Sequence, residues 1–387
     1  YADVFDGYTL YTSNAPYTTY LIDNDYNVIN EWDTGCQPAS MGYMLQDSTL
    51  VYPCKQADVV LEGVAASGGR ILKYNWNGDV IWDWSCDLDY QLHHDIEPTP
   101  NGTILALAME DIDGFRPDVV LEIETVGVND ANLVWTWKVS DHIGELNNPY
   151  TFYSEADYNQ LDWNHFNAVS LNQYGEILLS SRNWCEIYII EWGGSSDILY
   201  RWGNPQNYNG DGEQILFAQH GVNQIPIGYP GEGNIILFNN MNVQGQQEDG
   251  SSIIVEFIPD YETFEGEVVW TFEDDFYSAK QSGAFRLPNG NTFISVAQDG
   301  YMFEVTYDGV VVWELYQEGV VRAQKYGMDY FIVLGDVNSD GSIDILDVVL
   351  VVNYVLDNLY VAPADVNNDM VVNVLDVVVL VGNILNV

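Results

Sequence analysis

Histidine and arginine are scarce in this sequence, and their spacing is the first sign of chemistry. The 387 residues include five His and eleven Lys plus Arg. The segment HFNAVSLNQYGEILLSSR places His165 and Arg182 at its two ends, with a polar Gln-Tyr-Gly turn between them. A hairpin brings its last residue back to the level of its first, so we expect both side chains at the same edge of a sheet.

Histidines recur at the corresponding point of two neighbouring segments. His93 and His94 lie near the start of one predicted hairpin, and His220 starts another. The fifth histidine, His142, falls in a predicted outer loop. The remaining strand starts of this kind are Met41, Gly283 and Arg322. Because those strands need no histidine, we interpret the recurring histidines as a site.

The residue types favour an anion over a metal. Three histidines could bind a transition metal, but Arg182 beside them would repel the ion. A guanidinium offers a fork of donors that suits sulfate or phosphate. A histidine with a near-neutral pKa is also a competent nucleophile toward a sulfuryl or phosphoryl group.

A repeat of paired hairpins must position these residues. One family of hairpins closes on Trp and covers 18–33, 69–84, 118–139, 185–203, 251–273 and 300–316. A second family lies between them at 39–54, 92–108, 165–182, 219–240, 282–297 and 321–334. Alternating β-branched and aromatic residues with Asn-Gly and Asp-Gly turns indicate strands. Six four-stranded units predict a six-bladed β-propeller over 1–334, with residues 1–13 supplying a strand that closes the ring. The first strand of each inner hairpin would line the central channel, which brings the histidines together.

Charge and cysteine content indicate which partners and which cellular location to expect. A net charge of −47 argues against nucleic acid and anionic membranes as partners. No run of about 18 apolar residues predicts a membrane span. The sequence begins with Tyr1, and we expect a secreted, extracellular or cell-surface protein whose signal peptide has been removed. Four cysteines allow one or two disulfides, with Cys36 and Cys54 nearest in sequence, or buried free thiols.

The composition changes after Leu334. Residues 335–387 contain no Lys, Arg or His and hold two copies of an acidic loop, 29 residues apart. Oxygen ligands at loop positions 1, 3, 5, 7, 9 and 12 wrap a Ca²⁺ ion, with a backbone carbonyl at position 7. The first loop offers Asp336, Asn338, Asp340, Ser342, Asp344 and Asp347, and the second offers Asp365, Asn367, Asp369, Val371, Asn373 and Asp376. Met370 replaces the glycine expected at position 6, so we expect a weaker second site.

This tandem of a calcium loop followed by an apolar helix resembles a type I dockerin. The resemblance implies a small α-helical, EF-hand-like domain over 335–387 that binds one or two Ca²⁺ ions. It further implies a cohesin-like partner, or another copy of the chain, and so a role in extracellular assembly. The repeated LDVV at 346–349 and 375–378 makes the two helices pseudo-symmetric, as in that family.

The propeller sequence is similar to the arylsulfotransferase (arylsulfate sulfotransferase) family. The similar motifs are HHDIEPTPNG (93–102), WNHFNAVSLNQYGEILLSSR (163–182), DILYRWG (197–203) and QHGVNQIP (219–226). The resemblance implies transfer of a sulfuryl group from a phenolic sulfate ester to a phenol through a sulfated histidine, without a nucleotide cofactor. It assigns His220 as nucleophile, and His165, Asn167 and Arg182 as groups that hold the sulfate. His94, rather than His93, would be a further sulfate-binding or acid–base group. Gly221 stands where many relatives have an acidic residue, which removes one possible orienting partner of His220.

Two other interpretations remain open from sequence. A non-catalytic structural or adhesive propeller could assemble into a polymer or scaffold through its acidic tail. A lectin-like propeller could use Arg182 to bind sulfated glycans without transferring the group.

Overall fold

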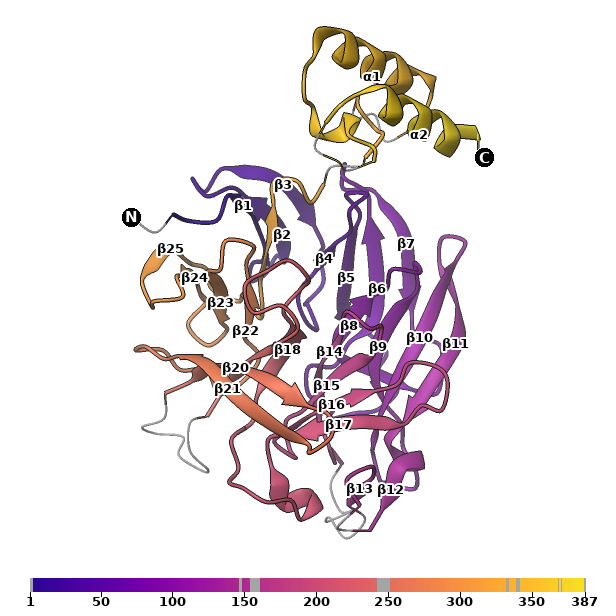
Figure 1. Ribbon diagram of the computed structural model, residues 1–387. Helices are drawn as coiled ribbons and strands as arrows, with labels where there is room; N and C mark the ends of the chain where they lie inside the picture. The colour runs from indigo at the N-terminus through magenta and orange to yellow at the C-terminus, as the bar shows by residue number, and fades with distance from the viewer. Residues whose placement is uncertain are drawn as a thin grey trace. The chain divides into compact units, whose positions relative to one another are not determined.

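A computed structural model describes residues 3–145, 148–153, 161–241, 251–331, 334–338, 342–367, 369 and 371–385. The chain divides into two compact units, one formed by Tyr1–Tyr43 with Leu50–Tyr326 and the other by Met44–Thr49 with Gly327–Val387. The first unit is a six-bladed β-propeller, as the repeat predicted (Figure 1). The second contains the C-terminal helices.

Each blade is a four-stranded antiparallel sheet, named here blade 1 to blade 6 from its strands. Blade 1 is β26 (Gln324–Gly327), β1 (Gly7–Thr12), β2 (Thr18–Ile22) and β3 (Val28–Asp33). Blade 2 is β4 (Tyr43–Met44), β5 (Leu50–Lys55), β6 (Gly69–Tyr74) and β7 (Val80–Ser85). Blade 3 is β8 (Gln91–Pro98), β9 (Ile104–Met109), β10 (Asp118–Val126) and β11 (Asp130–Lys138).

Blades 4 to 6 follow in the same order, innermost strand first. Blade 4 is β14 (Phe166–Leu171), β15 (Ile177–Ser181), β16 (Glu186–Ile190) and β17 (Ile198–Trp202). Blade 5 is β18 (His220–Gln224), β19 (Ile235–Asn239), β20 (Ile253–Asp260) and β21 (Glu265–Phe272). Blade 6 is β22 (Gly283–Arg286), β23 (Thr292–Val296), β24 (Tyr301–Val305) and β25 (Val311–Tyr316). A short parallel pair, β12 (Ile143–Gly144) and β13 (Phe152–Tyr153), lies between blades 3 and 4 in the chain.

The two ends of the propeller sequence meet in blade 1. The N-terminal strand β1 pairs with β26, so residues 1–13 do supply a strand that closes the ring. The expected hairpin at 321–334 is wrong: among its described residues only β26 is a strand, and its partner is β1 rather than a second strand of the same segment. Pairing of distant segments replaces the local hairpin because blade 1 is shared between the two ends.

The burial pattern follows from how blades stack. The middle strands β9, β16 and β23 are buried along their whole length, since each blade is covered on both faces by its neighbours. The outermost strand β3 is mostly exposed, and only Trp32 within it is buried. The strongest hydrophobicity therefore falls on the middle strands, which fixes the register of each sheet.

Tryptophans near the end of the outer strands join each blade to the next. The indole Nε1 of Trp32 donates to the carbonyl of Asn75 in blade 2 at 2.9 Å, and that of Trp313 donates to Asn24 in blade 1 at 3.0 Å, which closes the ring. Trp82, Trp137 and Trp270 make the same contact with the carbonyls of Asp130, Ser196 and Tyr307. In blade 4 the Tyr200 hydroxyl takes this place and donates to Glu265 at 2.8 Å. These aromatic residues are structural.

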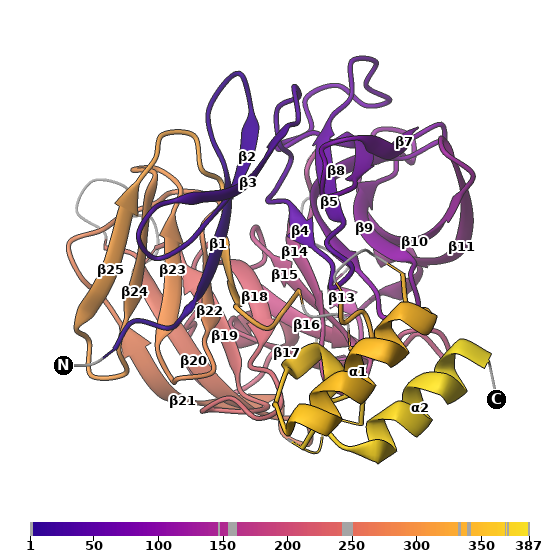
Figure 2. The same ribbon diagram turned by 90° about the horizontal axis from the view of Figure 1, so that it is seen from above.

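The second unit contains two helices that begin directly after the acidic loops. Helix α1 (Ile345–Asp357) is capped by Asp344, whose side chain accepts from Leu346 N, with Asp347 completing a capping box. Helix α2 (Val374–Leu385) begins after Asn373, whose Oδ1 accepts from Leu375 N at 2.8 Å. Figure 2 shows the two helices lying side by side. Val351 and Leu380 are fully buried between the elements of this unit, and its small core confirms the helical C-terminal segment expected from sequence.

One disulfide is present among the described residues. Cys36 and Cys54 are joined, with their Cα atoms 5.9 Å apart, as their proximity in sequence suggested. Cys86 and Cys185 are free thiols. No helix in the described part of the chain has the length and apolar character needed to cross a membrane.

Candidate active site

The histidines reach the channel mouth through irregular backbone at the starts of the innermost strands. His94 and His165 both have positive φ values, 49° and 53°. The pairing of β8, β14 and β18 with their neighbours shifts register between Leu92 and Ile96, Phe166 and Ala168, and His220 and Asn223. Such bulges re-aim side chains, and positive φ in a residue other than glycine costs roughly 1 kcal/mol or more. The same irregular backbone at neighbouring blades re-aims these side chains at one edge of the sheets, which makes that edge the candidate site.

The hairpin of blade 4 places its two ends together. Arg182 N donates to His165 O at 3.0 Å, so the arginine that follows β15 lies opposite the histidine that precedes β14, as predicted. His165 Nδ1 lies 2.5 Å from Asp162 Oδ2, so this nitrogen carries a proton and Nε2 is the free ring nitrogen. Asn183 links the same loop by donating to Asp162 O at 2.8 Å.

His220 is held in one tautomer. Its Nδ1 lies 2.8 Å from Asn240 Oδ1 and 3.0 Å from Ala218 O, and both of these atoms are acceptors. The Asn240 amide cannot be reversed, because its Nδ2 donates to the carbonyls of Ser278 and Gln281 at 2.8 and 3.1 Å. Nδ1 therefore carries the proton, and Nε2 keeps its lone pair.

Burial lowers the pKa of His220 to about 3, although the hydrogen bond that its Nδ1 donates to Asn240 opposes the shift. The imidazole is consequently neutral near pH 7. A neutral ring with one protonated and one free nitrogen is the form that a nucleophilic histidine requires.

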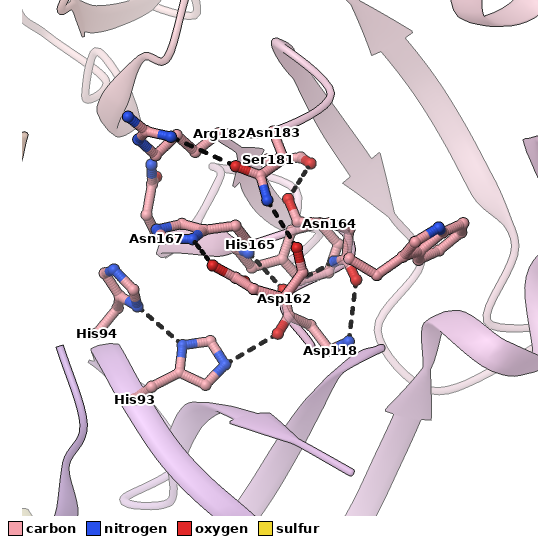
Figure 3. A network of polar contacts seen from close by, with 12 residues as sticks. His93, His94, Asp118, Asp162, Asn164, His165, Asn167, Ser181, Arg182 and Asn183 are labelled. Carbon is pink, nitrogen blue, oxygen red and sulfur yellow. Dashed lines mark hydrogen bonds and ion pairs between the residues drawn. The ribbon is translucent and has the colours of Figure 1, made fainter. Parts of the chain in front are cut away.

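A buried chain of contacts supports His94 (Figure 3). His93 Nδ1 lies 2.9 Å from His94 Nδ1, and His93 Nε2 lies 3.0 Å from Asp118 Oδ1. Burial lowers the pKa of His93, but the Asp118 carboxylate more than offsets this and raises it overall. Burial, together with the neighbouring His165 and His93, holds the pKa of His94 well below its usual range. The Nδ1 atom of His94 is occupied by His93, which leaves Nε2 to face the site.

Asp118 is itself fixed by three backbone or amide groups. Its Oδ2 accepts from the Nδ2 of Asn164 at 2.8 Å and from Phe166 N, while its own backbone N donates to Asn164 Oδ1 at 3.0 Å. Blade 3 is thereby tied to the start of β14 in blade 4. The rings of His94 and His165 lie in contact, with centroids 4.7 Å apart.

Four of the five residues assigned by resemblance line one cavity. His94, His165, Arg182 and His220 border an opening of about 580 Å³, a size typical of small-molecule sites. Asn167 does not line this opening: its Nδ2 donates to Gln219 O at 2.7 Å, and its side chain lines an adjoining cavity of about 20 Å³ that His94 and His220 also border. Asn167 therefore positions the residue before His220 and does not reach the wide cavity.

The small cavity has room for one water molecule and lies against Asn167, Arg322, His94 and His220. Asn167 Oδ1 and Arg322 Nε are buried without a hydrogen-bond partner among the described residues. Arg322 is anchored on its other side by Asp95, to which Nη2 donates at 2.6 Å. Tyr43 and Ser40 donate to the same carboxylate, so three blades are joined beneath the mouth.

Gly221 has a steric explanation. Its φ is +64°, and an added Cβ would lie 2.9 Å from Gly283 Cα and 3.0 Å from Ser282 O. The close approach of β18 to β22 leaves no room for an acidic side chain here. Asn240, on a different strand connection, orients His220 instead.

Sequence patterns did not identify the residues that support the histidines. Asn240 and Asp118 lie 20 and 25 residues from the histidines that they contact and belong to other elements, whereas Asp162 lies three residues before His165 in the same segment. His93, interpreted as the lesser of the adjacent pair, links His94 to Asp118. No motif distinguishes these residues from the many other Asn and Asp of the chain.

In the described parts of the chain, no group of three or more His, Cys, Asp or Glu side chains is arranged to hold a metal ion. Asp340, Gly341 and Met370 of the two acidic loops lie outside the described residues.

The rest of each loop fits a divalent cation. Asp336, Asp347, Asp365 and Asp376 are buried, yet the segment 335–387 contains no Lys, Arg or His. Burying carboxylates without a positive partner is costly. In both loops the last Asp accepts backbone N–H groups from the same two loop positions: Asp347 from Asn338 and Asp344, and Asp376 from Asn367 and Asn373. The described residues of the two loops therefore share one hydrogen-bond pattern around their last Asp.

Comparison with known proteins matches both units. A family model described as arylsulfotransferase (ASST) matches residues 59–306, and a type I dockerin domain model matches residues 334–385. No curated protein sequence is significantly similar to the chain.

Solved structures share the fold at low sequence identity. A protein of unknown function from Bacteroides caccae is 12% identical, with a TM-score of 0.52 over 83% of this chain and 98% of that one. A putative 6-phosphogluconolactonase from Bacteroides uniformis is 10% identical, with a TM-score of 0.47 over 83% of this chain and 100% of that one. At this identity the first likeness supports the propeller fold only.

Proposed function

The chain belongs to the arylsulfotransferase family, and from that premise we propose that its propeller moves a sulfuryl group from a phenolic sulfate ester to a phenol through a sulfated His220. The observation that carries the proposal is the fixed tautomer of His220. Its Nδ1 proton is engaged by Asn240 and Ala218, so Nε2 is the only nitrogen able to attack.

In the first half-reaction, His220 Nε2 attacks the sulfur as the bond between sulfur and the phenolic oxygen breaks. Arg182 and His165 lie at the same cavity. Arg182 would donate to the sulfuryl oxygens, and His165 would do so from Nε2 when the ring holds a proton on each nitrogen and Asp162 balances its charge. The leaving phenolate takes the proton of His94 Nε2. That proton is replaced at His94 Nδ1 from His93 Nδ1, across the 2.9 Å contact.

The second half-reaction reverses these transfers. An acceptor phenol gives its proton to His94 Nε2, its oxygen attacks the sulfur, and the bond between sulfur and His220 breaks. The proton returns to His93, which Asp118 stabilises in its charged form. One proton shift along the pair thus changes His94 from acid to base.

A transfer assay tests the activity. With p-nitrophenyl sulfate and a phenol acceptor, we expect nitrophenol release that requires the acceptor and that falls by at least about 10³-fold in His220→Asn. His142→Asn is the matched control, because His142 stacks on Trp137 away from the cavity. No transfer with any donor and acceptor would leave the structural or the glycan-binding interpretation.

For the C-terminal unit, we propose a calcium-dependent docking domain that tethers the propeller outside the cell or at its surface. When bound, Ca²⁺ would be held by the loop residues assigned above and would neutralise their carboxylates. The helices expose matching apolar side chains, with Leu346 and Leu375 56% and 57% exposed and Val349 and Val378 53% and 64% exposed. These pairs favour a cohesin-like partner, with another copy of the chain as the alternative. Size-exclusion chromatography of the isolated chain with and without a cohesin domain distinguishes the two.

A further inference from the structure

The basic residues of this protein are nearly all neutralised by acidic neighbours. The chain has 58 Asp plus Glu against eleven Lys plus Arg. Seven of the eleven form ion pairs with carboxylates: Arg70, Arg116, Lys138, Arg201, Arg286, Arg322 and Lys325. An eighth, Lys73, lies over the indole of Trp82 at 5.8 Å. With so many carboxylates available, a cation left without one needs an explanation.

The remaining three cations line the wide cavity. Lys55, Arg182 and Lys280 all border it, and none has a carboxylate partner within the described ranges. No Asp or Glu is present among the described residues that line this cavity, although the chain is rich in both. Three histidines complete the lining. The opening is therefore the electropositive region of a protein whose net charge is −47.

The three cations come from separate parts of the ring. Lys55 ends β5 in blade 2, Arg182 follows β15 in blade 4, and Lys280 lies in the connection that leads into blade 6. The histidines His94, His165 and His220 come from blades 3, 4 and 5. A single sulfuryl group bound at His220 beside Arg182 does not account for Lys55 and Lys280, which enter the cavity from the other blades.

We propose that the cavity selects an aryl sulfate or phenol that carries a second anionic group, a carboxylate or another sulfate, which Lys55 and Lys280 bind. This inference rests on the proposed function for the identity of the first group. The cavity, at about 580 Å³, holds an aromatic ring together with both anions. Lys280 directly precedes Gln281, whose carbonyl accepts from the Asn240 amide that orients His220, so the second group binds close to the reacting one.

A binding experiment tests this without turnover. Benzene-1,3-disulfonate and benzenesulfonate carry two and one sulfonate groups on carbon, which cannot be transferred. By titration calorimetry on the full chain, we expect the disulfonate to bind roughly 3- to 10-fold more tightly, with a preference that weakens as salt increases. Lys55→Gln with Lys280→Gln should bring the two affinities within about twofold, while Lys73→Gln leaves the preference unchanged. Equal affinities in the unaltered protein, or a preference that survives the double substitution, would overturn the proposal.

Steady-state kinetics identify the second anionic group and distinguish this inference from the proposed sulfuryl transfer. We expect 4-carboxyphenyl sulfate to exceed its amide, 4-carbamoylphenyl sulfate, in kcat/KM, through KM, and the double substitution to remove the difference. If only a disulfated donor shows this preference, the second group is a sulfate. Turnover without a charge preference for either would refute the inference while the proposed function stands. Selective disulfonate binding without any turnover would refute the proposed function while the anion site stands.

Discussion

The two units of this protein assemble charged sites in opposite ways. In the C-terminal unit, each set of oxygen ligands lies within twelve consecutive residues, and the spacing alone indicates Ca²⁺. In the propeller, His94, His165, Arg182 and His220 of the wide cavity come from three blades, and His220 depends on Asn240, which is 20 residues away. The acidic loops need an external cation because they contain none, whereas the cavity has three cations without carboxylate partners among the described residues. Local spacing therefore suffices for the first site, and the fold is needed for the second.

Calcium removal should give the largest difference between the two units. In the proposed docking domain, Ca²⁺ balances the buried Asp347 and Asp376. We therefore expect EDTA to raise hydrogen exchange across α1 and α2 to nearly unprotected rates and to abolish binding of a cohesin domain. Sulfuryl transfer by the propeller should be unchanged. Loss of transfer on chelation, restored by Ca²⁺ but not by Mg²⁺, would show that the two sites are not independent.

Substituting Asp118 or His93, which connect to His94 by hydrogen bonds, should have the next largest effect, a loss of transfer activity. Asp118→Asn or His93→Gln removes the source of the proton that His94 gives up, and supporting residues of this kind typically contribute 10- to 100-fold. The loss in kcat should be greater for phenyl sulfate than for p-nitrophenyl sulfate, because nitrophenolate leaves with little protonation. Asp111→Asn, which breaks an ion pair with Arg116 at the surface, is the control.

A purely structural role for Asp118 and His93 would lower both donors equally. That outcome would contradict the acid–base assignment of His94 but would leave His220 as nucleophile. The two substitutions therefore test the support of the site separately from its reacting atom.

The buried, neutral His220 should make propeller stability depend on pH. Its pKa of about 3 lies below that of an unfolded histidine, so the unfolded chain binds more protons as pH falls from about 6.5 toward 3. Between pH 7 and pH 5 the unaltered protein should lose about 2 kcal/mol more unfolding free energy than His220→Asn. Denaturant titrations of both proteins at the two pH values measure this difference. Equal losses would mean that His220 has the same pKa in the folded and unfolded states, which would contradict its burial as a neutral ring.

The ring-closing contact of Trp313 should give the smallest effect. Trp313→Phe removes the hydrogen bond to Asn24 O but keeps an aromatic ring against the core, which should cost about 1 kcal/mol of unfolding free energy. Transfer activity at 25 °C should not change. A large loss of activity in a folded variant would mean that the blade contacts position the mouth more directly than the geometry indicates.

The fold followed from local patterns more completely than the site did. Alternating strands and Trp-terminated hairpins repeat within each blade, so the six-bladed architecture and the closing role of the N-terminal strand were predicted. The hairpin at 321–334 was not correct, because β26 pairs with a strand more than 300 residues away. Turn chemistry specifies local hairpins and carries no information about such a partner.

At the channel mouth, too, local contacts could be predicted from sequence and distant contacts could not. His165 and Arg182 share one hairpin, so their proximity could be predicted from its two ends. Asn240 could not be linked to His220, since the contact depends on how β19 ends and on the turns that accept its amide. Asn167, assigned with the sulfate-binding groups, instead donates to Gln219 O beneath the mouth, because a bulge follows Phe166.

The central claim is that His220 carries the sulfuryl group between the two half-reactions. The direct measurement is mass spectrometry of the protein after brief mixing with p-nitrophenyl sulfate in the absence of acceptor, quenched and digested at alkaline pH to preserve the nitrogen–sulfur bond. We expect one sulfuryl group on the peptide that contains His220, its loss on addition of a phenol, and no modification in His220→Asn. A sulfuryl group on another residue, or rapid transfer with no modified protein at any time, would contradict the account.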